Sequence, residues 1–564
     1  MKRSLLLLAL VSLFAAQAFA GAHIVVNNLD PAGTGFNDPT PAAPIGGNPG
    51  TTKGQQALNV FQQAANIWGA NLDSTITINV DATFEPLTCS AAGSVLGSAG
   101  AQDVWSDFPN AEFSATWYHS ALASKRSGID LAAIDGLHDI RARFNSQLAT
   151  PVAICNNLTW YFGYDGNEGV NQIDLLAVVL HEFGHGLGFA TFINKSTGAQ
   201  LAGQPDIYEH YLADDSTSTP TSFLDMTNAQ RAAAIIKPLH VIWNGAKVDT
   251  AVTQTLAFGT PGLTVNSPGS IAGHYLVGSA AFGAPIGSPT VTAALVLAND
   301  GVGVLSDACT PLPAGSMTGA IGVADRGTCT FAAKAKVMQD AGAIGALIVN
   351  NAAGSPPPGL GGADPTITIP VGSLTLADGT AIKAQIGGGV NATLGVDLSL
   401  RAGADSAGHA LLYAPNPVVG GSSTSHWDPI ASPNQLMEPA INGDLTHNVV
   451  PPFDMTLPLF REIGWFPDAD LDLVADDNGD SCLGSDLNPT VVIGGNNSGV
   501  PNTLFTNGCT VKDFVNQCLA PATTRGGFNS CVAHLSDALL ANAVITSAQK
   551  DALQSAAARS KLGK

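Results

Sequence analysis

Residues 175–189 read LLAVVLHEFGHGLGF, and the interpretation of the whole chain starts from this stretch. The apolar run at 175–180 follows Asp174, a residue type that commonly caps the N-terminus of a helix. Glycine is common just beyond a helix C-terminus, so we expect this helix to end near Gly186 or Gly188. The stretch therefore predicts a buried helix of limited length.

This helix carries two histidines at a spacing suited to one metal ion. His181 and His185 are four residues apart, which places both imidazoles on one helix face. Neutral imidazole is a good zinc ligand, and a catalytic site needs three protein ligands plus an open position. Glu182 follows the first histidine, so its carboxylate can act as general base toward water that zinc acidifies. The HExxH pattern is a known signature of zinc metallopeptidases.

The third ligand has to come from elsewhere in the chain. The compact pattern HExxHxxGxxH has its glycine at Gly188, but Thr191 stands where the third histidine would be. A thermolysin-like glutamate further downstream would be Glu209, although the residues around it support this weakly. His426 is the better candidate, because it is followed by a tight turn that carries Met437. A methionine there would give the zinc site an apolar floor.

At these residues the chain resembles the leishmanolysin-like metzincins. That family keeps HExxHxxGF, carries its third histidine after an insertion in an SHW-like segment, and continues to an LMxP methionine turn. The matching segments here are 181–189, 425–427 and 436–439, and the resemblance covers residues 21–255 and 403–466. It implies zinc binding by His181, His185 and His426, the base role for Glu182, and the turn role for Met437.

The chain of 564 residues is long enough for about three domains. Its composition becomes rich in Gly, Ala and Val after about residue 255, and this region resembles a protease-associated (PA) domain, with a helical stretch at 331–340 and a strand-like run at 344–349. We expect an α+β fold: a zincin or metzincin-type catalytic domain interrupted by a PA-like α/β insert, plus a small C-terminal domain. The expected boundaries are 1–20 (signal peptide), 21–255 and 403–466 (catalytic domain), 256–402 (insert), 467–482 (Asp-rich linker) and 483–564 (C-terminal domain).

The first twenty residues have the features of a secretory signal. Lys2 and Arg3 precede an apolar stretch at 5–14, and Ala18 and Ala20 form a small-x-small cleavage site. We therefore predict a secreted protein, extracellular or periplasmic, with cleavage after about Ala20. No later stretch approaches the ~20 apolar residues that span a bilayer, so we expect no membrane span in the mature chain.

Charge and cysteine content narrow the environment further. The 23 basic residues are opposed by 44 acidic ones, and a net charge of −21 argues against nucleic acid as a partner. Eight cysteines, an even number, suggest disulfides in an exported protein. Their spacing suggests pairing of Cys89 with Cys155, of Cys309 with Cys329, and of the last four among themselves.

An acidic stretch follows the expected catalytic domain. Carboxylates at near-alternate positions can form a calcium loop, and the stretch resembles a thrombospondin type 3 or EF-hand-like repeat. However, Leu473 stands where such a loop usually has glycine, and a solvated acidic linker is an equal alternative. The candidate calcium ligands are Asp468, Asp470, Asp472, Asp476 and Asp480.

Together these features predict a secreted zinc-dependent endopeptidase that acts on proteins or peptides, with the insert modulating substrate access. Zinc is the expected cofactor, and calcium is a second one if the acidic stretch binds it. Two other readings stay open: an exported binding or adhesion protein with a vestigial metal site, and a zinc hydrolase for a non-peptide bond. The intact Glu182 argues against the first, since a structural site has no need of that carboxylate.

Overall fold

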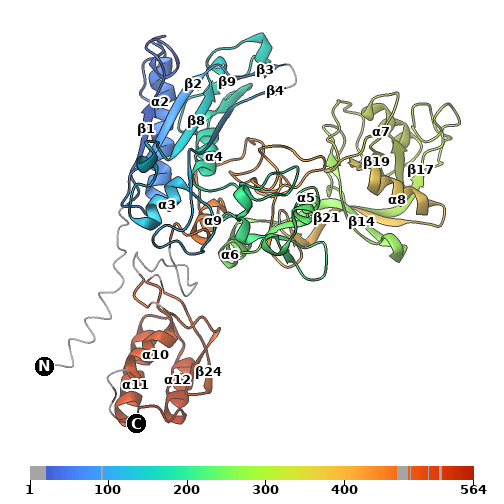
Figure 1. Ribbon diagram of the computed structural model, residues 1–564. Coiled ribbons are helices and arrows are strands. Elements are labelled where there is room, and N and C mark those ends of the chain that lie inside the picture. The colour runs from blue at the N-terminus through green and yellow to red at the C-terminus, as the bar shows by residue number, and fades with distance from the viewer. Residues whose placement is uncertain are drawn as a thin grey trace.

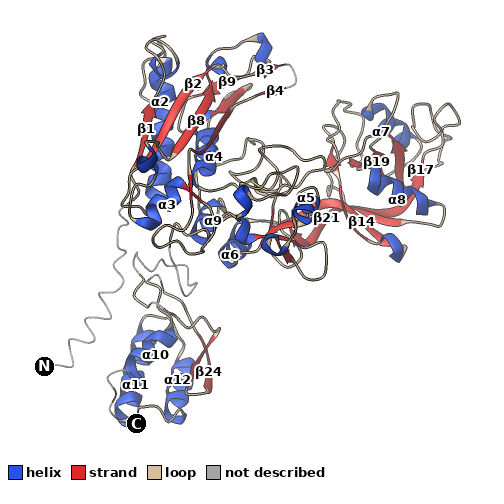
Figure 2. Cartoon of the chain, viewed as in Figure 1, coloured by secondary structure: helices blue, strands red, loops and turns tan. Residues whose placement is uncertain are grey.

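The computed structural model describes residues 21–90, 93–466, 480–482, 484–505, 507–519, 522 and 524–563. The predicted signal peptide and the residues Asp468, Asp470, Asp472 and Asp476 lie outside these ranges. Figure 1 shows that the N-terminal region and the segment after the insert pack together, while the insert projects to one side. A mostly helical C-terminal region follows (Figure 2). Within the described ranges, no helix is both long and apolar enough to cross a bilayer.

A four-stranded sheet forms the base of the first region. Strands β1 (Ile24–Asn28), β2 (Ile78–Glu85) and β8 (Ile140–Asn145) run parallel, in that order. Strand β5 (Gly97–Ala101) pairs antiparallel with β8 and stands at the edge of the sheet. Helix α2 (Lys53–Asn71) packs against this sheet with Phe61, whose ring lies 4.6 Å from that of Phe144 on β8. Strands β1 and β5 are therefore the two edges of this sheet.

Local hydrogen bonds set where α2 and β2 begin. Thr52 caps α2 by accepting a hydrogen bond from the Gln55 N–H, so the helix begins at Lys53. Strand β2 begins at Ile78, although apolar and polar residues already alternate from Thr75. The delay has a local cause, because the Ser74 hydroxyl donates to the Ile76 carbonyl and accepts from the Ile76 N–H, which bends the chain.

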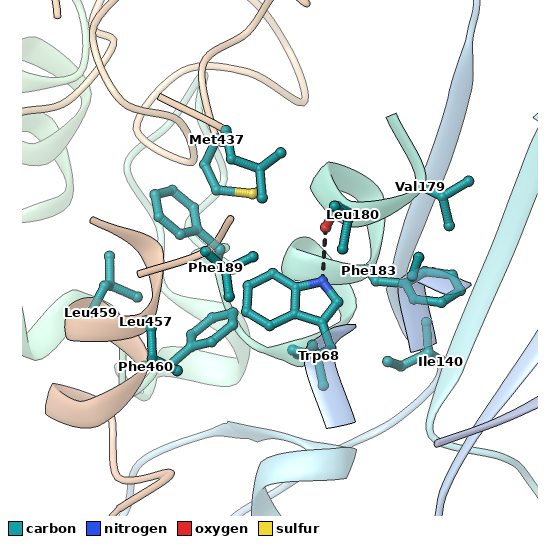
Figure 3. Close-up of a cluster of buried hydrophobic side chains, with 14 of the residues drawn as sticks. Trp68, Ile140, Val179, Leu180, Phe183, Phe189, Met437, Leu457, Leu459 and Phe460 are labelled. Atoms are coloured by element: carbon teal, nitrogen blue, oxygen red, sulfur yellow. Dashed lines mark hydrogen bonds between the residues drawn. The ribbon is translucent and has the colours of Figure 1, made fainter. Parts of the chain in front are cut away.

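Helix α4 (Leu175–Leu187) has the bounds that the sequence predicted. The Asp174 carboxylate accepts hydrogen bonds from the first-turn amides, and Gly188 ends the helix with a φ of 129°. Helices α2 and α4 are joined by the Trp68 indole N–H, which donates to the Leu180 carbonyl at 3.0 Å (Figure 3). This bond sits inside a wholly buried apolar cluster, which fixes the position of α4 over the sheet.

Shorter elements complete the first region. A second sheet has the order β12-β11-β13-β22, and β22 comes from beyond the insert, so the two halves of the chain share one sheet. Its strands are Thr221–Ser222, Leu212–Asp214, Val241–Trp243 and Ala410–Leu411. The helices are α3 (Ser120–Ser127), α5 (Asn228–Ala234), α6 (Ala246–Thr255) and α9 (Thr456–Glu462). The remaining strands are β3 (Cys89–Ser90), β4 (Gly93–Ser94), β6 (Val104–Trp105), β7 (Tyr118–His119), β9 (Thr159–Tyr161) and β10 (Gln172–Asp174).

The insert is built on an eight-stranded sheet of order β15-β14-β21-β17-β18-β19-β20-β16. Its first and last long strands, β14 and β21, pair antiparallel, so the chain enters and leaves the insert at one place. The strands in sequence order are Phe258–Ser267, Gly273–Leu276, Gly278–Ser279, Val291–Leu297, Ile321–Asp325, Gly345–Val349, Val371–Leu374 and Asn391–Arg401. Its helices are α7 (Phe331–Asp340), which was predicted with these bounds, and α8 (Leu376–Ile386).

The C-terminal region contains a hairpin and three helices around their own apolar core. These elements are β23 (Thr490–Ile493), β24 (Asn496–Pro501), α10 (Val511–Leu519), α11 (Arg525–Ala541) and α12 (Ser547–Arg559). The two predicted disulfide pairs are confirmed, and the last four cysteines pair among themselves. The four bonds are Cys89–Cys155, Cys309–Cys329, Cys482–Cys509 and Cys518–Cys531, a pattern typical of proteins that fold in an oxidising compartment.

We predict that the insert and the rest of the molecule fold independently. The main core draws on residues before 257 and after 403, whereas the insert has its own cores, and the Ala402 N–H donates to the Ala257 carbonyl where the two meet. A variant with residues 258–401 replaced by a short Gly-Ser linker, and the isolated 256–402 segment, should each unfold cooperatively by circular dichroism. An insoluble or non-cooperative product from either piece would contradict this division.

Candidate metal centre

Three histidines from two distant segments of the chain lie close together at helix α4. His181 and His185 come from the helix, and His426 comes from the loop after the insert. The three Nε2 atoms lie 3.1, 3.2 and 3.2 Å from one another. Within the described residues this is the group of side chains with metal-ligand geometry. The three nitrogens of a tetrahedral zinc site, each 2.0–2.1 Å from the ion, lie about 3.3 Å apart, close to these distances.

Each of these rings is held by a backbone carbonyl on its far side. The Nδ1 of His181 lies 2.7 Å from the Leu436 carbonyl, that of His185 lies 2.8 Å from the Phe189 carbonyl, and that of His426 lies 2.9 Å from the Ser422 carbonyl. A carbonyl only accepts, so each Nδ1 carries the proton and donates it. Each Nε2 then has a lone pair and no proton, so the short contacts between the three Nε2 atoms are not hydrogen bonds. An arrangement of three lone pairs that point at one place is suited to bind a cation.

The protonation states agree with this arrangement. Burial lowers the pKa of His181 to about 4 and that of His185 to about 3, and it lowers the pKa of His426 well below its usual value. The imidazoles are therefore neutral at physiological pH, as metal ligation requires. Three converging lone pairs repel one another unless a cation lies between them, so the residues present fit a zinc ion.

Glu182 is held beside this cluster by the edge strand. Its Oε2 accepts a hydrogen bond of 2.8 Å from the Ala99 N–H on β5, while Oε1 has no hydrogen-bond partner among the described residues. Burial raises the pKa of the Glu182 carboxyl to about 7, and the Ala99 hydrogen bond opposes this rise. A carboxylate with one oxygen fixed and a raised pKa is suited to accept and return a proton.

Met437 lies under the histidines and against the helix. A Cβ on Gly184 would lie 2.6 Å from the Met437 sulfur, so only glycine at 184 allows the thioether to pack this closely. Figure 3 shows Met437 in the same apolar cluster as Trp68 and Phe189. The Met437 carbonyl accepts from the Trp427 N–H, which ties this turn to the residue after His426. The turn thus supports two of the three histidines.

Neither alternative position for the third ligand joins the group of three histidines. Thr191 stands where the compact HExxHxxGxxH pattern has its third histidine. Its hydroxyl donates to Asp206 and its N–H donates to the Ser425 hydroxyl, so this position lies next to the segment that carries His426. Glu209 is fully buried and accepts from Gln200, away from the cluster. Of the candidate calcium ligands, the described one is Asp480, which accepts from the Cys482 N–H. The calcium prediction thus falls almost entirely outside the described residues.

A cavity of about 630 Å³ opens over the three histidines. One wall is the edge strand with the residues that lead into it, at 94–101. The facing wall is formed by 190–192, Lys195, 421–422 and 425–426, and 438–441 close one end. The insert contributes no described residue to this lining. The cavity is thus an open cleft along β5 rather than a closed chamber.

Sequence reasoning missed two polar side chains in this cleft. His119, at the end of β7, is almost fully buried, and neither ring nitrogen has a hydrogen-bond partner among the described residues. Lys195 extends into the facing wall and donates to the hydroxyls of Thr424 and Ser425. Neither residue belongs to a motif, and only the folding of separate loops brings them to the site.

Residues 291–382 match the PA domain family. The match lies within the insert and spans its parallel strands β17 to β20 together with α7 and most of α8. The insert contains a PA domain. The resemblance inferred from sequence is therefore confirmed for this part of the chain, while the match leaves the region that carries the histidines unassigned.

Other similarities cover small parts of the chain. Over 84 residues the chain is 42% identical to the probable leucine aminopeptidase 2 of Aspergillus fumigatus, which is 14% of this chain and 17% of that protein. Among solved structures, a zinc aminopeptidase from Bacillus subtilis is 24% identical over 26% of this chain and 35% of its own, with a TM-score of 0.20. An aminopeptidase from Aneurinibacillus sp. strain AM-1 is 17% identical over 27% and 37%, with a TM-score of 0.19. The chain thus spans between 17% and 37% of the length of each of these proteins.

We predict that His426→Ala lowers zinc affinity by more than about 100-fold, because loss of even an outer-shell partner of a ligand costs 10–100-fold. Glu209→Gln, of equal size, should leave zinc affinity unchanged. Zinc content by atomic emission and affinity by chelator competition would measure both. If Glu209→Gln lost zinc while His426→Ala kept it, the site would be of the thermolysin-like kind and this assignment of the third ligand would be wrong.

Proposed function

We propose that this protein is a zinc-dependent peptidase whose ion is held by His181, His185 and His426. The observation that carries the proposal is the convergence of three neutral imidazoles beside a tethered carboxylate, in an open cleft. When bound, zinc would supply a Lewis acid that lowers the pKa of water and polarises a substrate carbonyl. The similarity to a probable leucine aminopeptidase supports peptide bonds as the target.

Each side chain of the site then has a definite task. The Glu182 carboxylate takes a proton from the attacking water and returns it to the leaving amine. The Ala99 N–H holds the Glu182 carboxylate in an orientation that faces the cleft. The side chain therefore does not have to rotate before it takes the proton. The backbone carbonyls behind the three rings hold each Nδ1–H, which fixes the ring orientation and makes Nε2 more basic.

The finer form of the proposal is a metzincin-type endopeptidase. The HExxHxxGF motif, the distant histidine and the turn at Met437 support the metzincin type. An edge strand along the cleft supports binding of an extended chain that passes through the site, because β5 leaves one row of backbone groups unpaired by other strands. Secretion, proposed from the N-terminal sequence, agrees with the four disulfides.

An aminopeptidase is the second candidate, because the similar fungal protein carries that name. Such an enzyme needs a group that binds the free α-ammonium of its substrate. The carboxylates that line the cleft are Glu182 and Glu438, and the latter accepts from the Gln435 N–H and the Asn442 amide. Since Glu182 is used as the base and Glu438 is engaged, the lining favours an endopeptidase.

In this proposal the insert acts on substrate access through the chain segment that leads to the cleft. Ser355 of the insert exchanges two backbone hydrogen bonds with Asn416, at 2.6 and 2.7 Å. Asn416 shortly precedes Gly421, where the cleft lining begins again. In this proposal, a partner or substrate segment that binds the PA domain acts through these two hydrogen bonds on the loop that carries His426.

We predict that Glu182→Gln keeps zinc but lowers kcat/KM by about 10²–10⁴-fold, the usual contribution of a general base. The amide has the same shape as the carboxylate but cannot accept the proton. Zinc content and cleavage of casein should be measured on the same sample, with and without a chelator. Glu168→Gln, outside the cleft, is the matched control. Unchanged turnover in Glu182→Gln would refute the mechanism.

We also predict that the enzyme cuts peptides whose N-terminus is acetylated as fast, within about twofold, as the free peptides. An endopeptidase makes no contact that requires a terminal ammonium, whereas loss of a paired charge costs an aminopeptidase about tenfold or more. Mass spectrometry of paired peptides gives both rates and the cleavage positions. Cleavage confined to the first residue of free peptides would make the aminopeptidase the correct reading.

A further inference from the structure

We propose that Lys195 forms a carboxylate-binding subsite in the cleft, which selects peptides with an acidic group close to the bond that is cut. This inference rests on the proposed peptidase function and adds its substrate class. The shared chemistry is a carboxylate, supplied either by an Asp or Glu side chain or by the free C-terminus of the peptide.

The first support is the position of Lys195. Its Nζ donates to the Thr424 hydroxyl at 2.8 Å and to the Ser425 hydroxyl at 3.2 Å, and Ser425 directly precedes the ligand His426. Both hydroxyls are satisfied by other groups as well, since Thr424 donates to the Ser423 carbonyl and Ser425 accepts from the Thr191 N–H. The ammonium is therefore fixed in the cleft wall, close to the metal centre.

The second support is the balance of charge around that ammonium. Within the described part of the chain, no carboxylate lies within ion-pair distance of Lys195, and it is the one basic side chain, histidines apart, in the cleft lining. An ammonium has three donors, and the two hydroxyls take two of them. The third donor is free for a ligand, and Lys195 lines the cavity that a ligand would enter.

The third support is the cost of leaving this cation without an anion. Burial lowers the pKa of Lys195 to about 7, and the more distant Asp206 and Glu209 only partly oppose this effect. Two neutral hydroxyls compensate a desolvated charge poorly, whereas a carboxylate compensates it well through a charge-assisted hydrogen bond. A substrate carboxylate would thus complete a half-satisfied site, while a basic side chain would be repelled.

The test uses the zinc-loaded full chain and a set of quenched fluorescent peptides. One arm varies an internal residue among Glu, Gln and Lys in C-terminally amidated peptides, and the other compares free and amidated C-termini. Lys195→Met should lower the preference for Glu over Gln, or for the free over the amidated terminus, by about tenfold or more. Lys195→Arg should keep most of it, and Lys336→Met, on the surface of α7, should change nothing.

Binding provides a readout that does not depend on turnover. The zinc-loaded Glu182→Gln variant should bind the Glu peptide more tightly than the Gln peptide, and the added Lys195→Met change should remove that difference. If peptides are cut with equal rates for Glu and Gln, or if Lys195→Met slows all peptides alike, the subsite is refuted and the peptidase stands. If no peptide is cut, the proposed function fails, and the binding comparison still decides the subsite. Lys195→Gln replaces the Met variant if that one does not fold.

Discussion

The hydrogen bond from His181 Nδ1 to the Leu436 carbonyl, 2.7 Å long, joins the two halves of the site. It connects the helix that carries the HExxH motif to a turn that lies beyond the insert. The carbonyl is aimed by its own neighbours, because the Leu436 N–H donates to Asp454 at 2.6 Å. The same turn places Met437 against Gly184 and receives the Trp427 N–H. A single turn therefore orients one ligand from the helix and one from the distant loop.

This constraint explains how the chain can carry a long insertion inside the region that holds the three histidines. Strands β14 and β21 pair from Phe258 with Arg401 onward, so the two chain ends leave the insert side by side. The core beneath the histidines is built from residues on both sides of the insert, and β22 completes a sheet begun before it. The entropy cost of bringing the two parts together is low, since the insert closes its own loop.

The sequence predicted the parts of the site that depend on local pattern. Asp174, the apolar run and Gly188 fixed the bounds of α4, and His426 was placed with the cluster because a methionine turn follows it. The parts that depend on long-range packing were not predicted. Nothing near Ala99 marks it as the anchor of Glu182, since any residue but proline offers that N–H. The position of Lys195 could not be predicted either, because it depends on two hydroxyl groups that belong to another loop.

In the proposed metal site, ion binding would be coupled to the order of the loop that carries His426. Two ligands sit on a buried helix, but His426 lies on a loop that returns from the insert and contains Thr424 at a φ of 59°. Without a cation, the three Nε2 lone pairs repel one another. A bound zinc ion would reverse the sign of this interaction, and its binding free energy would stabilise the loop by RT ln(1 + [L]/Kd). Because Lys195 is hydrogen-bonded to this loop, the order that zinc would impose would extend to the proposed carboxylate subsite as well.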